Sequence, residues 1–227
     1  MSGLRTTFAL VRWECLRELQ RGETVVSMIL FALVTLFVIS FAIDPSTETA
    51  VKAQPGILWI VLLLAGTIGV ERSFGKPGEE RVLEGLLLAP VSRTTIYYSR
   101  IISTWIFVAV MQVFVIVAFI VLYNVKSDAT AIGIVLLAAW SGAIGFVSLG
   151  VTIAAMTRSI QGGEVLLRLL LMPLLIPFFK GVVSLTTQAL RGWEIGIREI
   201  TIIIAFDLVY VAVGQLLFEH VVADFDG

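Results

Sequence analysis

The chain has little of the charge that a soluble enzyme needs. Only 15% of its 227 residues are charged, whereas 58% are hydrophobic, and the mean hydropathy is +0.99. A water-soluble domain of this size would have to expose a large share of those apolar side chains to water. The composition therefore excludes a soluble domain and indicates a membrane protein.

Reactive side chains are also scarce. The sequence has one cysteine and one histidine, so neither an internal disulfide nor a zinc site can be assembled from the usual ligands. No G-x-x-x-x-G-K-[ST] phosphate loop occurs, because the only Gly-Lys pair is followed by Pro77. The 16 Lys and Arg nearly balance the 17 Asp and Glu, so no net charge attracts nucleic acid. We expect no enzyme activity, no metal and no ATP hydrolysis in this chain.

Long apolar runs dominate what is present. Six of them are candidates to cross about 30 Å of hydrocarbon at about 1.5 Å per residue; the second is short and should extend to Glu71 and Arg72. They do not alternate with polar residues as barrel strands do, and therefore predict helices. The runs cover residues 25–43, 57–70, 101–123, 131–156, 165–184 and 200–218. The predicted fold is an all-α membrane protein whose six-span transmembrane domain occupies residues 25–227.

Residues 1–24 predict a separate helix that lies on the bilayer. Four arginines alternate there with apolar side chains. At helical spacing the apolar side chains form one stripe, as expected for an amphipathic interfacial helix. The stripe consists of Leu4, Phe8, Val11, Cys15 and Leu19.

Positive charges near the ends of the spans predict the orientation. With the N-terminus inside, eleven of the 16 Lys and Arg fall on inner segments and five on outer loops. We therefore expect a multi-pass protein of the inner (cytoplasmic) membrane with both termini in the cytoplasm. The last outer loop, residues 184–199, is compatible with a short re-entrant piece or with a plain loop.

Two spans carry features that shape helix packing. The fourth has small residues at steps of three and four, which predict a face for close helix contact. That face comprises Ala138, Ser141, Gly142, Gly145, Ser148 and Thr152. The fifth span contains Pro173 and Pro177, one turn apart, which predict a kink or partial unwinding because each proline removes a backbone donor.

Asp207 is the one carboxylate well inside a predicted span. Because an ionised carboxylate is costly in hydrocarbon, it should face the bundle, where it serves either an interhelical hydrogen bond or an ion relay. Tyr210, Gly214 and Gln215 lie on the same side of the helix, and Gln112 of the third span is a candidate partner.

The inner loop between the second and third spans carries the clearest pattern. Residues 79–88 predict a short helix in which acidic and apolar side chains alternate, and Ser92 should cap the helix that follows. A helix this short is not stable alone, so it either docks on a partner or lies on the membrane.

This loop and two spans carry a resemblance. VLEGLLLAPVSR resembles the cytoplasmic coupling region of ABC-2-type permeases. PGILWIVLLLAGTIGVERSF (55–74), LEGLLLAP (83–90) and GGEVLLRLLLMPLLIPFF (162–179) together resemble the haem exporter protein B family (CcmB) of cytochrome c maturation. Arg81 and Arg168 stand where many members have glycine and proline.

The resemblance implies an ABC-2 permease-like fold, with residues 1–24 as an elbow-like helix. It implies a permease subunit for haem export or delivery to a periplasmic chaperone. The implied partners are a CcmA-like ATP-binding subunit, a CcmC-like haem-handling membrane protein, a CcmE-like haem chaperone and a second copy. The chain itself would bind no cofactor, haem being the handled ligand and ATP the partner's. Glu71 and Arg72 would be anchoring charges at the membrane edge, and the docking residues would be Glu80, Leu83, Glu84, Leu86, Leu87 and Pro90.

Three other functions fit the same residues. One is an ABC-2 permease for another lipophilic substrate. Another is a secondary transporter coupled to protons through Asp207. The last is a membrane scaffold that moves nothing.

Overall fold

The computed structural model describes residues 3–43, 47–73, 92–157 and 163–223, and within these ranges every regular element is a helix. The helices are α1 (Gly3–Arg21), α2 (Glu23–Ala42), α3 (Glu48–Glu71), α5 (Arg93–Leu122), α6 (Ala129–Thr157), α7 (Gly163–Leu190) and α8 (Ile197–Ala223). The predicted all-α membrane fold is confirmed: six of these helices, α2 to α8, are long and apolar enough to span a membrane.

Two spans begin earlier than their apolar runs. α3 starts at Glu48 rather than residue 57, because the Thr47 hydroxyl caps it by accepting from the backbone N–H of Ala50 at 3.2 Å. α5 starts at Arg93 rather than residue 101, with Ser92 as the expected cap, whose hydroxyl accepts from the N–H of Thr95 at 3.3 Å. A search for apolar runs omits these turns because they are polar.

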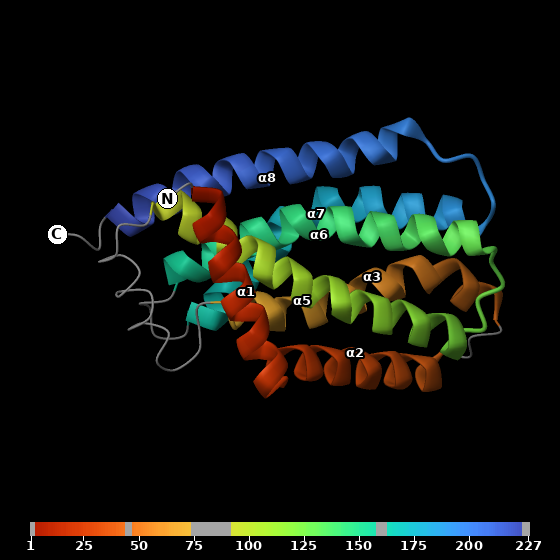
Figure 1. The fold of residues 1–227 in the computed structure, drawn as a ribbon. Coiled ribbons are helices and arrows are strands. Elements are labelled where there is room, and N and C mark those ends of the chain that lie inside the picture. Colours follow the sequence, from red (N-terminus) through yellow and green to blue (C-terminus); the bar gives the residue numbers. More distant parts are fainter. Residues whose placement is uncertain (1–2, 44–46, 74–91, 158–162, 224–227) are drawn as a thin grey trace.

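The six long helices run roughly along one axis, and α1 crosses their end (Figure 1). The start of α1 and the described end of α8 lie at that same end, which we call the α1 end. The loops from α5 to α6 and from α7 to α8 lie at the opposite end, which we call the far end. An even number of spans brings both ends of the described chain to one side.

The helix α1 turns only part of its apolar stripe inward. Val11 is buried, whereas Leu4, Phe8 and Leu19 are exposed, as expected for side chains that meet lipid at the membrane edge. Cys15 is half-buried on the same stripe. Burial raises the pKa of its thiol and the charge of Glu14 raises it further, so Cys15 stays a protonated packing group.

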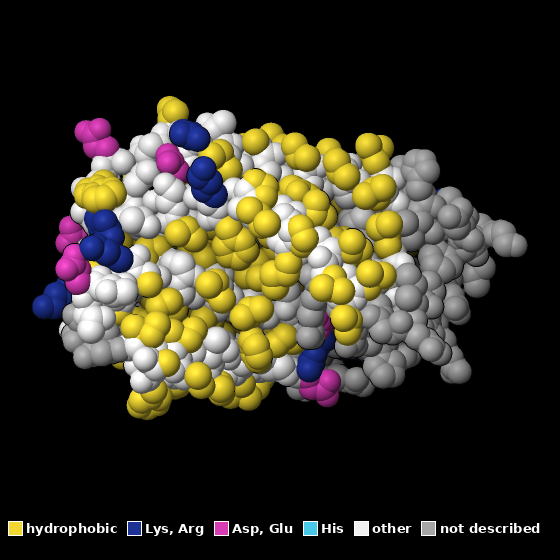
Figure 2. Space-filling model, turned by 180° about the vertical axis from the view of Figure 1, so that it is seen from behind, with side chains coloured by type: hydrophobic (Ala, Val, Ile, Leu, Met, Phe, Trp, Pro, Cys, Tyr) yellow, Lys and Arg dark blue, Asp and Glu magenta, His cyan; other side chains and the backbone are white. Residues whose placement is uncertain are grey.

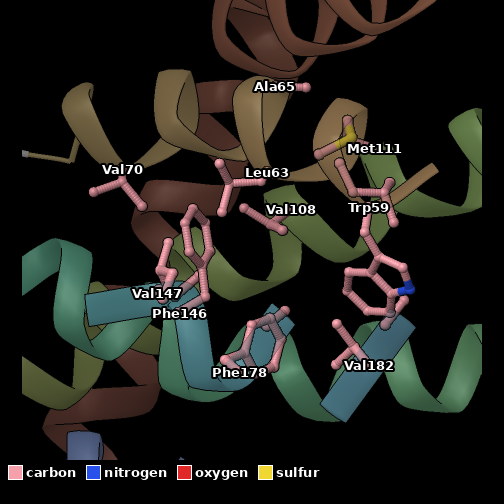
Figure 3. Close-up of a cluster of buried hydrophobic side chains, with 14 of the residues drawn as sticks. Trp59, Leu63, Ala65, Val70, Val108, Met111, Phe146, Val147, Phe178 and Val182 are labelled. Carbon is pink, nitrogen blue, oxygen red and sulfur yellow. The ribbon is translucent and has the colours of Figure 1, made fainter. Parts of the chain in front are cut away.

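Aromatic side chains fill the middle of the bundle between α3, α6 and α7 (Figure 3). The rings of Trp59 and Phe178 meet edge to face, with centroids 5.9 Å apart. The indole N–H of Trp59 donates to the Thr186 hydroxyl at 2.8 Å. Both side chains are almost fully buried, so this bond satisfies polar atoms that could find no water inside the membrane.

The predicted small-residue face of α6 is a packing face. A Cβ added at Gly142 would lie 2.5 Å from the ring of Phe178 on α7, and one at Gly145 would lie 2.7 Å from the ring of Phe206 on α8. The lack of side chains at these positions therefore lets α6 approach its neighbours closely.

The outer surface and the last loop agree with a bundle that spans a membrane. Figure 2 shows hydrophobic side chains spread along the length of the described body, with charged ones gathered at the far end and a few near the α1 end. Residues 191–196 form a plain loop with Gly192 at φ 65°, because α7 continues as a helix to Leu190 and α8 begins at Ile197. The re-entrant alternative is therefore wrong.

We expect the substitution Gly142→Ala to destabilise the protein by about 1–3 kcal/mol, because the new methyl group overlaps the Phe178 ring. The matched control is Gly133→Ala on the same helix, where nothing lies within 4 Å of an added Cβ. That control should be neutral or slightly stabilising. Thermal unfolding in detergent measures both variants, and equal midpoints would contradict the packing role of the face.

Candidate functional site

Charged side chains gather at the α1 end, around a small cavity bordered by α1, α2, α3 and α5. We call Glu14, Arg17, Glu18, Arg72 and Arg100 the charged cluster. Its members come from helix α1, from the residue that ends α3 and from α5. Charges at this depth must be paired, because partial burial removes much of their hydration.

An ion pair joins α1 to α5. The carboxylate of Glu14 lies 3.1 Å from the guanidinium of Arg100, and the side chains are only 12% and 6% exposed. The Ser103 hydroxyl, one turn further along α5, also donates to Glu14. Because the pair and its extra hydrogen bond are shielded from water, this contact fixes where α1 crosses the bundle.

Glu18 joins α1 to α2. Its carboxylate accepts from the backbone N–H of Thr24 at 2.6 Å, from the Thr24 hydroxyl at 2.9 Å and from the N–H of Val25 at 3.1 Å. These N–H groups belong to the first turn of α2, where a negative charge is favourable. Gly22, at φ 63°, makes the tight bend between the two helices that brings Glu18 there.

Arg72 joins the end of α3 to α2. It is the C-cap of α3, and its guanidinium donates to the Ser27 hydroxyl of α2 at 3.1 Å. Glu71, the last residue of α3, is half-exposed beside it. The predicted membrane-edge charges therefore lie at the α1 end, and Arg72 belongs to the charged cluster.

The predicted docking residues lie outside the described residues, because all of them fall within residues 74–91. The described chain on either side leads into the charged cluster. Arg72 lies two residues before this segment, and Arg100 lies in the second turn of the helix that follows it. Both flanks are therefore bonded to α1 or α2.

Asp207 lies in a polar seam between α6 and α8. Its carboxylate accepts from the backbone N–H of Gly145 at 2.9 Å, so the structure shows the interhelical hydrogen bond. Further along, the Ser148 hydroxyl donates to the carbonyl of Tyr210 at 3.0 Å and pairs with the hydroxyl of Tyr97 at 2.7 Å. Gly145 permits the approach, because a Cβ there would lie 2.6 Å from the Asp207 oxygen.

Gln112 does not pair with Asp207, contrary to the sequence prediction. Its amide N–H donates to the carbonyl of Ala139 at 3.2 Å, which places it between α5 and α6. Asp207 instead bonds Gly145 on α6, so both side chains bond backbone atoms of α6 rather than each other. The buried amide oxygen of Gln112 has no hydrogen-bond partner among the described residues. The mid-span location of both residues was visible in the sequence, but their directions around the helix axes were not.

The helix α7 continues through Pro173 and Pro177 without a break, so the partial unwinding expected there does not occur. A bend at these prolines stays a prediction. Pro177 leaves the carbonyl of Pro173 without its helical donor. The hydroxyl of Tyr210 on α8 donates to the next carbonyl, that of Leu174, at 3.1 Å. This hydrogen bond from α8 thus stabilises α7 next to the position where Pro177 removes a backbone hydrogen bond of the helix.

Sequence reasoning missed the inward-facing acids of α1. The amphipathic pattern predicted for residues 1–24 places polar side chains toward water, whereas the structure turns Glu14 and Glu18 inward. Their spacing of four residues puts both on one face, next to Val11 and Cys15. That spacing was the available signal, but nothing in the sequence named Arg100 or α2 as the partner.

The fold and the site define a multi-pass helical membrane protein with an amphipathic helix bound across one end by buried charges. Residues 5–223 match the CcmB protein family, and the chain belongs to that family. This confirms the family resemblance inferred from the sequence.

Relatives named heme exporter protein B cover most of the chain. The protein from Pseudomonas aeruginosa is 25% identical over 70% of this chain and 70% of its own length. The protein from Rhodobacter capsulatus is 28% identical over 73% and 75%. The protein from Bradyrhizobium diazoefficiens is 23% identical over 91% and 92%.

We expect that Glu14→Gln or Arg100→Gln alone lowers the free energy of unfolding by about 3–5 kcal/mol, because each removes one partner of a shielded ion pair. The double variant should lose less than the sum of the two. The control cycle uses Glu48→Gln and Lys52→Gln, an exposed i,i+4 pair whose coupling should be about 0.3–0.5 kcal/mol. Denaturant unfolding in detergent measures both cycles, and additive losses at Glu14 and Arg100 would show that the pair does not hold α1.

Proposed function

We propose that this protein is the permease subunit of an ABC-type haem exporter, driven by a separate ATP-binding subunit. The match of residues 5–223 to the CcmB family carries the proposal. The relatives' printed name, heme exporter protein B, supplies haem as the handled ligand. The six apolar spans supply the membrane body of such a subunit.

The assembly follows the resemblance. A CcmA-like subunit would hydrolyse ATP, while CcmC-like and CcmE-like proteins would handle haem on the other side of an inner membrane. The proposed orientation puts the α1 end and both termini in the cytoplasm, as the distribution of Lys and Arg indicates. The segment 74–91 would then face the ATP-binding subunit.

Motion would enter the membrane body through the charged cluster. ATP-driven closure of the partner would push the segment 79–88, which leads directly to α3 and α5. Arg72 bonds α2 and Arg100 bonds α1, so a displacement of either flank would also displace the helix that is bonded to it. Closely packed helices shift as units rather than deform, so the push would move α1 and α2 with α3 and α5.

One observation favours the secondary-transporter alternative, and another counts against it. Asp207 does lie in a polar seam of several hydroxyl groups. Its carboxylate, however, bonds a backbone N–H of α6, which is the arrangement of a structural interhelical bond. The ABC-type function therefore accounts for more of the chain.

We expect that replacing both Leu83 and Leu86 by Asp abolishes co-purification with the ATP-binding subunit, because charges would replace the apolar contact. The matched control replaces both leucines by Met, which keeps the apolar volume and should keep the complex. Size-exclusion chromatography of the tagged complex measures both. An intact complex with the Asp variant would rule out the docking role.

Asp207→Asn separates the ABC-type function from the proton-coupled alternative. Asn keeps an oxygen that can accept from the Gly145 N–H, so cytochrome c maturation in cells should persist in this variant. Maturation that survives deletion of the ATP-binding subunit but fails in Asp207→Asn would instead favour proton coupling.

A further inference from the structure

A cavity of about 600 Å³ opens at the far end, remote from the charged cluster. The first turns of α3, the loop from α5 to α6 and the end of α7 form its walls. A second cavity of about 640 Å³ adjoins it and shares Lys126, Ser127, Leu190 and Arg191. We call the first cavity the far-end pocket. Its volume falls in the range of small-molecule sites.

Two cations from different loops line the far-end pocket. Lys126 follows α5 and Arg191 follows α7, and the lining contains no acidic residue. Among the described residues no ion pair is recorded for either cation. The guanidinium of Arg191 stacks over the ring of Trp193 at 5.0 Å, which limits its freedom. The adjoining cavity adds a single acid, Asp128.

The buried hydroxyl of Tyr123 is a second feature that points to a ligand. It lines the far-end pocket, and its side chain is only 2% exposed. Within the described part of the chain its buried hydroxyl has no hydrogen-bond partner. Such a group is unfavourable unless something polar reaches it. Its ring stacks on Phe119, with centroids 4.9 Å apart.

The rest of the lining mixes polar and apolar side chains. Gln54, Asn124, Ser127 and Thr187 are the polar ones, and Val51, Pro55, Val125 and Leu190 are the apolar ones. The site thus combines two cations and several uncharged polar groups with stretches of aliphatic wall. In Figure 2 the charged side chains of the far end border directly on the hydrophobic surface of the spans, so a molecule with one charged end can rest there with its apolar body against the protein.

We propose that the far-end pocket binds an amphiphilic anion, whose carboxylate or phosphate groups lie between Lys126 and Arg191. The Tyr123 hydroxyl donates to the same anion, and the apolar body of the ligand covers the surrounding aliphatic walls. Two sources supply this chemistry: the carboxylates of a porphyrin such as haem, and the headgroup of an anionic phospholipid. The porphyrin source rests on the proposed function, whereas the anion site itself does not.

Titration of the full chain in phosphatidylcholine nanodiscs tests this site. One arm adds haem and follows its Soret absorbance, and the other adds phosphatidylglycerol and follows bound lipid by native mass spectrometry. We expect the double variant Lys126→Gln and Arg191→Gln to bind one of the two probes at least tenfold more weakly. Tyr123→Phe should weaken the same probe severalfold.

The matched control is Lys52→Gln. Lys52 lies in the first turns of α3 but does not line the pocket, and it pairs with Glu48. It should bind both probes like the unmodified chain. Selective loss of haem binding identifies a porphyrin site, and selective loss of phosphatidylglycerol identifies a lipid site.

Absence of binding by the unmodified chain, or equal affinity in all variants, would overturn the inference. The double variant should still co-purify with the ATP-binding subunit, because the far-end pocket is at the opposite end of the bundle from the end of α3 and the start of α5, between which the docking segment lies in the chain. An intact complex in the docking experiment, together with normal anion binding, would rule out the docking role and leave the inference about the far-end pocket unaffected.

Discussion

The shielded contact between Glu14 and Arg100 sets the position of the only long described helix that does not span the bundle. Without it, α1 would hold to the membrane edge by a few apolar side chains, most of which face outward. The Glu18 carboxylate then ties α1 to the start of α2, and Arg72 ties α2 to the end of α3. Four helices are therefore bonded to one another at the α1 end, where α3 ends and α5 begins.

The polar groups deeper in the bundle have a different character. Asp207, the amide N–H of Gln112 and the carbonyl of Leu174 each bond a single neighbouring helix, through a backbone atom or one hydroxyl. Such bonds fix helix contacts without linking many elements. A force applied at the α1 end would therefore act on four helices that are bonded to one another. The middle of the bundle is held mainly by close packing at residues such as Gly142. The helices would therefore move as rigid units when the α1 end is displaced.

Much of the fold could be predicted, because the requirement to span hydrocarbon leaves a strong imprint on composition. The six spans, the Ser92 cap and the small-residue face of α6 all followed from local patterns. The site was harder. Which way Gln112 points, and that Glu14 turns toward Arg100, depend on how distant helices are rotated against one another. The far-end pocket needed the same information, because Lys126 and Arg191 are 65 positions apart and meet only in the folded bundle.

The account depends most on segment 74–91 meeting an ATP-driven partner on the side of α1. The direct measurement uses a Cys15→Ser background with a single cysteine introduced by Glu80→Cys, treated with a membrane-impermeant maleimide. We predict labelling in inverted vesicles only, with protection when the ATP-binding subunit is bound, whereas Asn124→Cys at the far end should label only in intact spheroplasts. Labelling of Glu80→Cys from the periplasm, or no protection by the partner, would contradict the account.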